Sequence, residues 1–169
     1  MIRYLLGVDL AKELDYTSFA VIKMVYPEQS SPNDSEYLYR LLALDRVRGV
    51  DYPTIIETIL ATLEVIPEAN DGPHLCLDAS GLGAPIRDYL QRSGTFVNKS
   101  QIYPVVFTGG EGARRDPTTG NYNISKSLII GNFLSLQQHK RFRYAKDLQA
   151  LPLLEQEIAS FQATLDPTR

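Results

Sequence analysis

Two aspartates, Asp9 and Asp78, each stand at the end of a short apolar segment. Residues 3–9 and 74–78 both have the continuous apolar character of a buried strand. If these strands are neighbours, the two carboxylates converge at one edge of the sheet. A divalent cation that prefers oxygen ligands, such as Mg²⁺ or Mn²⁺, would relieve their repulsion. The alternative is that both aspartates only cap turns after strands.

The hydrophobic pattern predicts a sheet that makes the two strands neighbours. The candidate strands at 3–9, 18–26 and 36–48 follow one another and predict three antiparallel strands. The later segments alternate between helical and strand patterns. We expect helices over 52–66, 81–90, 124–138 and 151–162, and strands over 74–78 and 102–107. This order predicts an α/β fold, a ribonuclease-H-like mixed sheet of three antiparallel and then parallel strands, flanked by helices.

Length and composition favour one domain over residues 1–169. With 44% hydrophobic and 22% charged residues, the chain can form a core and is not disordered. The net charge of −3 gives no positive field over the whole surface, so any contact with DNA must be local. One cysteine and two histidines exclude a disulfide and a Cys/His zinc site. We expect a cytoplasmic protein, since no segment resembles a signal peptide or a membrane span.

Basic residues gather in two segments. Arg114 and Arg115 lie in a glycine-rich stretch, 109–123, where we expect a loop. The second segment alternates basic and aromatic residues and contains Lys140, Arg141, Arg143 and Lys146. Positive charge beside an acidic edge would bind DNA phosphates without sequence preference, whereas an edge strand protected by charges explains the second segment equally well. Lys126 begins a helix and is expected to meet a scissile phosphate or to offset the carboxylates.

Two further acidic residues are weaker candidates for metal ligands. Asp15, in the turn after the first strand, either binds a second metal or holds the turn through the amides of Thr17 or Ser18. Glu157 falls on the apolar side of the last expected helix, where it either approaches the aspartates as a ligand or reaches solvent at the edge of that side. The structural alternative is the preferred one for both residues.

Three segments in order resemble the nuclease domain of the terminase large subunit of tailed bacteriophages. They are GVDLAKELDYTSFAV at 7–21, CLDASGLG at 76–83 and YPVVFTG at 103–109. The resemblance implies a ribonuclease-H-like endonuclease that cuts double-stranded DNA with Mg²⁺ or Mn²⁺ during genome packaging in the bacterial host cytoplasm. It implies metal-binding, catalytic roles for Asp9 and Asp78. It also implies a terminase ATPase domain, a small terminase subunit or a portal as partner.

The sequence departs from this family in two places. The third acidic motif has no counterpart, because the sequence ends in LDPTR and Asp166 is a poor substitute. The ATPase motor is missing too, since the segment GNYNISKS has Ser125 where a Walker A loop needs glycine. We therefore expect a nuclease domain shortened at its C-terminus. The alternatives are a catalytically inactive prophage-derived domain that binds DNA or a partner and, less favoured, an ATP-handling domain of the actin type.

Overall fold

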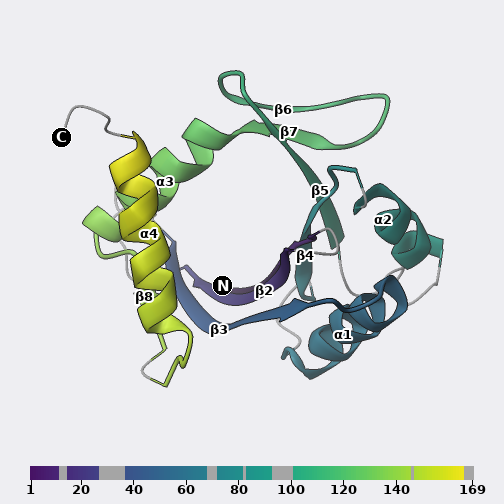
Figure 1. Cartoon of the computed structure of the whole chain (residues 1–169), viewed down its shortest axis with the longest axis horizontal. Helices are drawn as coiled ribbons and strands as arrows, with labels where there is room; N and C mark the ends of the chain where they lie inside the picture. Colours follow the sequence, from purple (N-terminus) through teal and green to yellow (C-terminus); the bar gives the residue numbers. More distant parts are fainter. Residues whose placement is uncertain are drawn as a thin grey trace.

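The computed structural model describes residues 1–11, 15–26, 37–67, 72–81, 83–92, 101–145 and 147–165. These residues form one eight-stranded sheet and four helices (Figure 1). The strands are β1 (Ile2–Asp9), β2 (Tyr16–Val25), β3 (Leu38–Arg48), β4 (His74–Asp78), β5 (Gln101–Thr108), β6 (Ala113–Arg115), β7 (Tyr122–Ser125) and β8 (Phe142–Tyr144). The helices are α1 (Tyr52–Val65), α2 (Gly83–Arg92), α3 (Lys126–Gln138) and α4 (Leu151–Leu165).

The sheet has the order β6-β7-β5-β4-β1-β2-β3-β8. Strands β1, β2 and β3 are antiparallel neighbours, whereas β4 pairs parallel to β1, β5 parallel to β4 and β7 parallel to β5. The predicted α/β fold with a mixed sheet is therefore confirmed. The central strands β3, β2, β1, β4 and β5 have an order and directions compatible with a ribonuclease-H-like fold.

The main hydrophobic core lies on one face of the sheet, under α1 and α2. Asp51 caps the N-terminus of helix α1, since its carboxylate accepts a hydrogen bond from the Thr54 amide, and Pro53 fits the first turn. Alternate residues of the strands meet the two helices on this face. The buried cluster contains Leu6, Val8, Phe19, Ile55, Ile59, Ile66, Leu75, Leu77, Ile86 and Leu90. Burial of each large apolar side chain contributes about 1.5–3 kcal/mol, so this cluster holds the two aspartate-bearing strands together.

Helices α3 and α4 lie away from that core. Figure 1 shows α1 and α2 together on one side of the molecule and α3 and α4 on the other. No residue of α3 is fully buried, although Ser125 caps the helix by accepting a hydrogen bond from the Leu128 amide. The second face of the central strands is therefore less tightly covered, and it carries the hollows described below.

The segment expected to be a loop over 109–123 is mostly a β-hairpin. It contains β6 and β7, and β7 also takes the first residues of the helix expected at 124–138. Gly112 and Gly120 adopt positive φ angles of 82° and 72°, which favour glycine. Between the strands, Asp116 Oδ1 accepts hydrogen bonds from the Thr118 and Thr119 amides. These local bonds, rather than apolar alternation, build the hairpin.

The remaining element ends agree with the sequence-based expectations to within a few residues. Strand β4 has the predicted bounds, and the segment containing Arg143 is the short edge strand β8, parallel to β3. The expected first residue of the third strand, Glu36, lies outside the described residues, as do Lys146 and Asp166. No helix in the described ranges has both the length and the apolar character needed to cross a membrane.

Candidate active site

The structure brings Asp9 and Asp78 together. Strands β1 and β4 pair in parallel, and their last pair is Val8 with Leu77. Asp9 and Asp78 are the next residue on each strand, so the same register places them side by side. The two carboxyl groups are close enough to share a hydrogen bond when one of them is protonated. Both line an open hollow of about 330 Å³ on the face opposite α1 and α2. The convergence expected from the order of the strands is thus present.

The turn after β4 fixes the position of Asp78. Its Oδ1 atom accepts a hydrogen bond of 2.8 Å from the Ser80 amide, and the Ala79 amide bonds the Val105 carbonyl at 2.7 Å. Helix α2 starts directly against this turn. A Cβ atom at Gly83 would collide with the backbone carbonyl of Asp78. The glycine therefore lets the helix approach closely, and the approach holds the carboxylate at the edge of the sheet.

The electrostatic state of Asp9 reflects this crowding. The residue is exposed by area, but its carboxyl group is partly shielded from water by the surrounding protein, and this desolvation raises its pKa above 3.8. The negative charge of Asp78 and the hydrogen bond to it raise the pKa further. Lys126, the first residue of α3, acts in the opposite direction on the pKa. The lysine lowers the pKa of Asp9 by less than desolvation and Asp78 together raise it.

A single row of paired residues crosses the sheet through the two aspartates; we call it the aspartate row. From β6 to β3 it contains Arg115, Tyr122, Val105, Asp78, Asp9, Ser18 and Arg46. Residues directly opposite one another on neighbouring strands point to the same face of a sheet. The carboxylates therefore lie near the middle of the row, and an arginine stands at each end.

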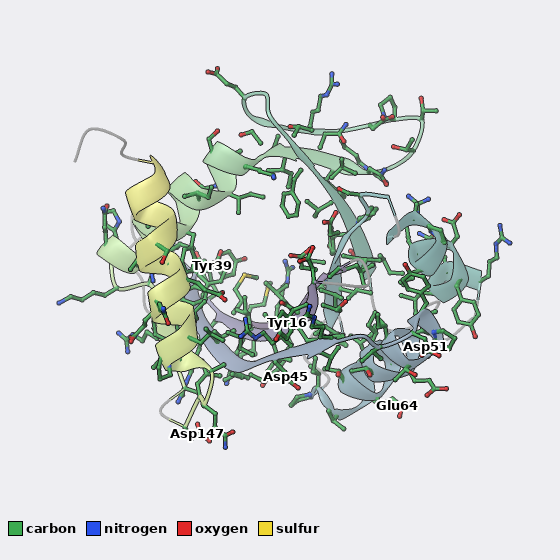
Figure 2. All side chains as sticks on the ribbon, viewed as in Figure 1. Tyr16, Tyr39, Asp45, Asp51, Glu64 and Asp147 are labelled. Carbon is green, nitrogen blue, oxygen red and sulfur yellow. The ribbon has the colours of Figure 1, made fainter. Side chains whose placement is uncertain are left out.

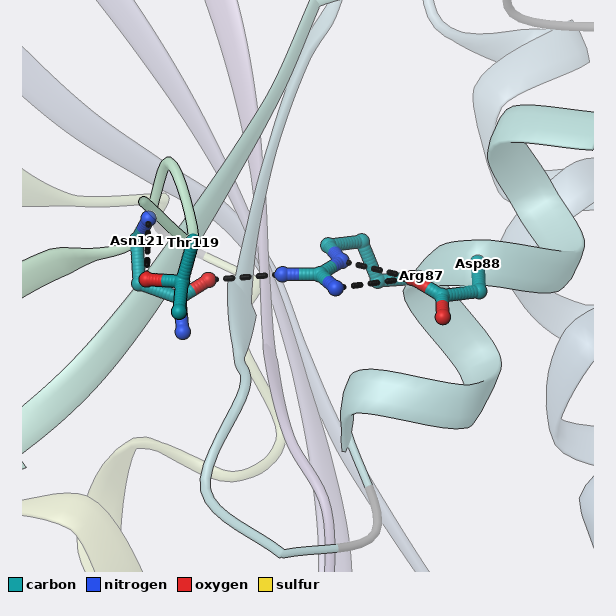
Figure 3. A network of polar contacts seen from close by, with 4 residues as sticks. All are labelled: Arg87, Asp88, Thr119 and Asn121. Carbon is teal, nitrogen blue, oxygen red and sulfur yellow. Dashed lines mark hydrogen bonds and ion pairs between the residues drawn. The ribbon is translucent and has the colours of Figure 1, made fainter. Parts of the chain in front are cut away.

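The β6–β7 hairpin supplies one end of the row. The Arg115 guanidinium carbon lies 5.7 Å from the centroid of the Tyr122 ring. Because successive residues of a strand point to opposite faces of the sheet, Arg114 faces away from the aspartates. Figure 3 shows how the hairpin is tied to α2: Arg87 donates to Asn121 Oδ1 at 2.7 Å and to Asp88 Oδ1 at 2.7 and 3.0 Å. This link ties the turn of the arginine-bearing hairpin to α2.

The other basic candidates lie at the opposite edge of the sheet, separated from β1 by β2 and β3. Arg141 donates from its Nε and Nη2 atoms to the Tyr37 carbonyl at 3.1 and 2.9 Å, which gives it a structural partner. Lys140 has a positive φ of 56° where the chain leaves α3. Lys140 and Arg143 are exposed. The structure does not bring these three residues to the aspartates.

The two weaker acidic candidates also lie apart from the pair. Asp15 lines a different hollow, together with Thr17 and Asp51. Glu157 on α4 forms an ion pair with Arg46, with 3.1 Å between Oε1 and Nη1. Across the described part of the chain, no three His, Cys, Asp or Glu side chains gather into a group suited to a metal ion.

Sequence reasoning missed Arg46, Arg48 and Tyr16. Tyr16 pairs with Arg48, and Ser18 pairs with both Asp9 and Arg46, so the three missed residues lie on the face of the aspartates. The spacing of two between the arginines shows that they share a face of a strand. Only the register between β2 and β3 shows which face that is.

The donor set of the pair fits a hard divalent cation. Mg²⁺ is commonly bound through one or two carboxylates together with waters and substrate phosphates, so two aspartates are enough protein ligands for such a site. Desolvation and the negative charge of Asp78 raise the pKa of Asp9, and a bound cation would act against both effects. Lys126 is close enough to affect the carboxylates and sits at the start of a helix, where a phosphate oxygen is also favoured.

Comparison with protein-family models and with curated proteins gives no match for this chain.

Proposed function

We propose that the chain is a metal-dependent endonuclease domain of the phage or prophage terminase type. Its reaction would be hydrolysis of phosphodiester bonds in double-stranded DNA during genome packaging, in the bacterial host cytoplasm. A terminase ATPase domain, a small terminase subunit or a portal would be its partners. The contact between Asp9 and Asp78 in an open hollow carries this proposal. Strand order compatible with a ribonuclease-H-like fold supports it.

Each residue of the site has a part in the proposed reaction. Asp9 and Asp78 would hold Mg²⁺ or Mn²⁺ through their carboxylate oxygens. The bound ion would supply Lewis acidity toward water and a counter-charge for the scissile phosphate. Lys126 would contact a phosphate oxygen and offset part of the negative charge at Asp9. Ser18, which lines the same hollow, offers a hydroxyl within the aspartate row.

Cleavage of supercoiled plasmid DNA tests this proposal. We expect nicked and linear DNA in the presence of Mn²⁺ or Mg²⁺ and none with EDTA. Asp9→Asn and Asp78→Asn should each lower the rate by at least about 100-fold, as removal of an essential electrostatic group does. The matched control is Asp147→Asn, at an exposed aspartate just before the N-terminus of α4 (Figure 2). Metal-dependent cleavage that survives both substitutions would refute the proposal.

A second candidate function is a catalytically inactive domain that binds DNA or a packaging partner. The observation that favours it is the size of the acidic group, since only two carboxylates meet among the described residues. This candidate predicts duplex binding that is retained in Asp78→Asn, with no cleavage under any metal condition. The plasmid assay thus separates the two candidates.

A further inference from the structure

We propose that Arg46 and Arg48, stacked with Tyr16, form a binding site for DNA backbone phosphates beside the two aspartates. The inference rests on the proposed nuclease function and deepens it by naming a second point of contact with DNA. We call Tyr16, Arg46 and Arg48 the arginine–tyrosine cluster. Its members lie at the start of β2 and the end of β3, next to the strand that ends in Asp9.

The cluster holds two positive charges together. The guanidinium carbon of Arg46 lies 4.3 Å from the centroid of the Tyr16 ring, and that of Arg48 lies 5.6 Å from it. Each contact is a favourable cation–π interaction, but two guanidinium groups on one ring also repel each other. An anion bound between them removes this repulsion. Tyr16 is 44% exposed, so a ligand can reach the cluster from solvent.

The cluster opens toward the aspartates. A hollow of about 450 Å³ is lined by Tyr16, Ser18 and Arg46 on the sheet and by Leu154 and Glu157 on α4. Ser18 also lines the hollow of the aspartates, so the two hollows adjoin. In Figure 2 Tyr16 lies toward the centre of the molecule, and Asp45, next to Arg46 on β3, also lines this hollow.

The spacing suits consecutive phosphates of a nucleic acid strand. Arg46 is two strands from Asp9 in the aspartate row, which corresponds to roughly 10 Å at 4.8 Å between strands. Because the backbone winds around the duplex axis, successive phosphates of one strand lie farther apart than the axial rise of 3.4 Å per nucleotide, so this length spans roughly one to two phosphate steps. A DNA strand with one phosphate at the aspartates would therefore bring a later phosphate to the cluster. Guanidinium groups recognise phosphates through paired N–H donors.

Glu157 occupies part of this site when no DNA is bound. Its ion pair with Arg46 is open to solvent, with 39% of the arginine side chain and 60% of the glutamate side chain exposed. Exposed ion pairs of this kind contribute little, so a phosphate can replace the carboxylate. Glu157 thereby weakens DNA binding instead of holding a metal ion. This role differs from the metal-ligand role considered for it from the sequence.

Fluorescence anisotropy with a labelled 20-base-pair DNA duplex, in EDTA and at several salt concentrations, tests the site. The variants are Arg46→Gln/Arg48→Gln, Arg48→Gln alone, Glu157→Gln and the control Arg92→Gln, which removes one positive charge, as Arg48→Gln does, at an exposed residue of α2. We expect the double variant to bind about 10-fold more weakly and to lose up to about 2 from the slope of log K against log salt, whereas Arg92→Gln changes neither. Glu157→Gln should bind about threefold more tightly.

The outcomes separate this site from the nuclease proposal. If the wild-type chain binds and cuts DNA but the double variant binds as Arg92→Gln does, the arginine–tyrosine cluster is not a phosphate site, and the nuclease proposal stands. If the wild-type chain neither binds nor cuts duplex DNA, both proposals fail. Weaker duplex binding by Glu157→Gln overturns the competition between Glu157 and phosphate. Circular dichroism of each variant identifies any loss of folding, and Arg48→Gln alone then replaces the double variant.

Discussion

Asp9→Asn should stabilise the protein when no divalent cation is present. In the folded chain, desolvation of the Asp9 carboxylate and its repulsion by Asp78 raise its pKa above 3.8. Two unit charges about 4 Å apart repel by about 4 kcal/mol at an effective dielectric constant of 20. Exposure to solvent and the nearby Lys126 reduce this to about 1 kcal/mol. For a domain of this size, 1 kcal/mol corresponds to roughly 2–4 °C in Tm.

The size of this gain in stability depends on pH. Because the folded chain binds the Asp9 proton more tightly than the unfolded chain does, the wild-type protein is relatively stabilised below the ordinary carboxyl pKa of 3.8. That contribution is lost as the pH rises through the higher folded-state pKa. The gain in Tm from Asp9→Asn should therefore be present at pH 7 and decrease toward pH 4. Asp147→Asn should show no such trend.

Differential scanning fluorimetry measures the Tm of each protein, first in EDTA for the effect of the repulsion and then with Mn²⁺ for the effect of a bound cation. At 100 times its Kd, a ligand that binds only the folded state contributes about 2.7 kcal/mol, which is roughly 5–11 °C here. Mn²⁺ should raise the Tm of the wild-type protein and of Asp147→Asn, and should have much less effect on Asp9→Asn. Two results would refute the idea that Asp9 and Asp78 repel each other and that a bound cation removes this repulsion. One is a lower Tm for Asp9→Asn than for the wild type in EDTA at pH 7. The other is an equal response of the wild type, Asp147→Asn and Asp9→Asn to Mn²⁺.

Two further perturbations test how the site is held. Gly83→Ala places a methyl group on the Asp78 carbonyl and should cost at least about 2 kcal/mol, measured by urea unfolding. Gly131→Ala, in open space on α3, should instead stabilise by about 0.5–1 kcal/mol, and equal effects at the two glycines would contradict the close approach of α2. Arg87→Ala removes the link from α2 to Asn121 and should speed amide hydrogen exchange in the β6–β7 hairpin while leaving β1 and β4 unchanged. Unchanged exchange in the hairpin would show that this link does not restrain it.

The parts of the site that the sequence predicts are those fixed by strand order. Continuous apolar segments ending in Asp9 and Asp78 identify two buried strands, and a parallel β1–β4 pair places their last residues together. The β6–β7 hairpin escapes prediction because its strands are only three and four residues long and its turn depends on Asp116. The arginine–tyrosine cluster could not be predicted from the sequence for another reason. It depends on the register of β2 with β3, which shifts between Val21 and Ile22, and such a shift cannot be read from alternation alone.

If the aspartates bind a metal ion and Arg46 binds DNA as proposed, the arrangement of charge along the aspartate row should couple the two binding events. Arg46 would then attract a DNA strand, whereas the metal-free carboxylates roughly 10 Å away would repel it, and a Debye length of about 8 Å would screen that repulsion only in part. A divalent cation on the aspartates changes the repulsion into attraction, so the arginines and the metal site should favour the same DNA position. Because coupling between two binding events is reciprocal, DNA held by the arginine–tyrosine cluster should strengthen metal binding by the same factor. With a net charge of −3, the chain has no general attraction for DNA, and this local coupling would restrict metal-loaded catalysis to DNA already held at both points.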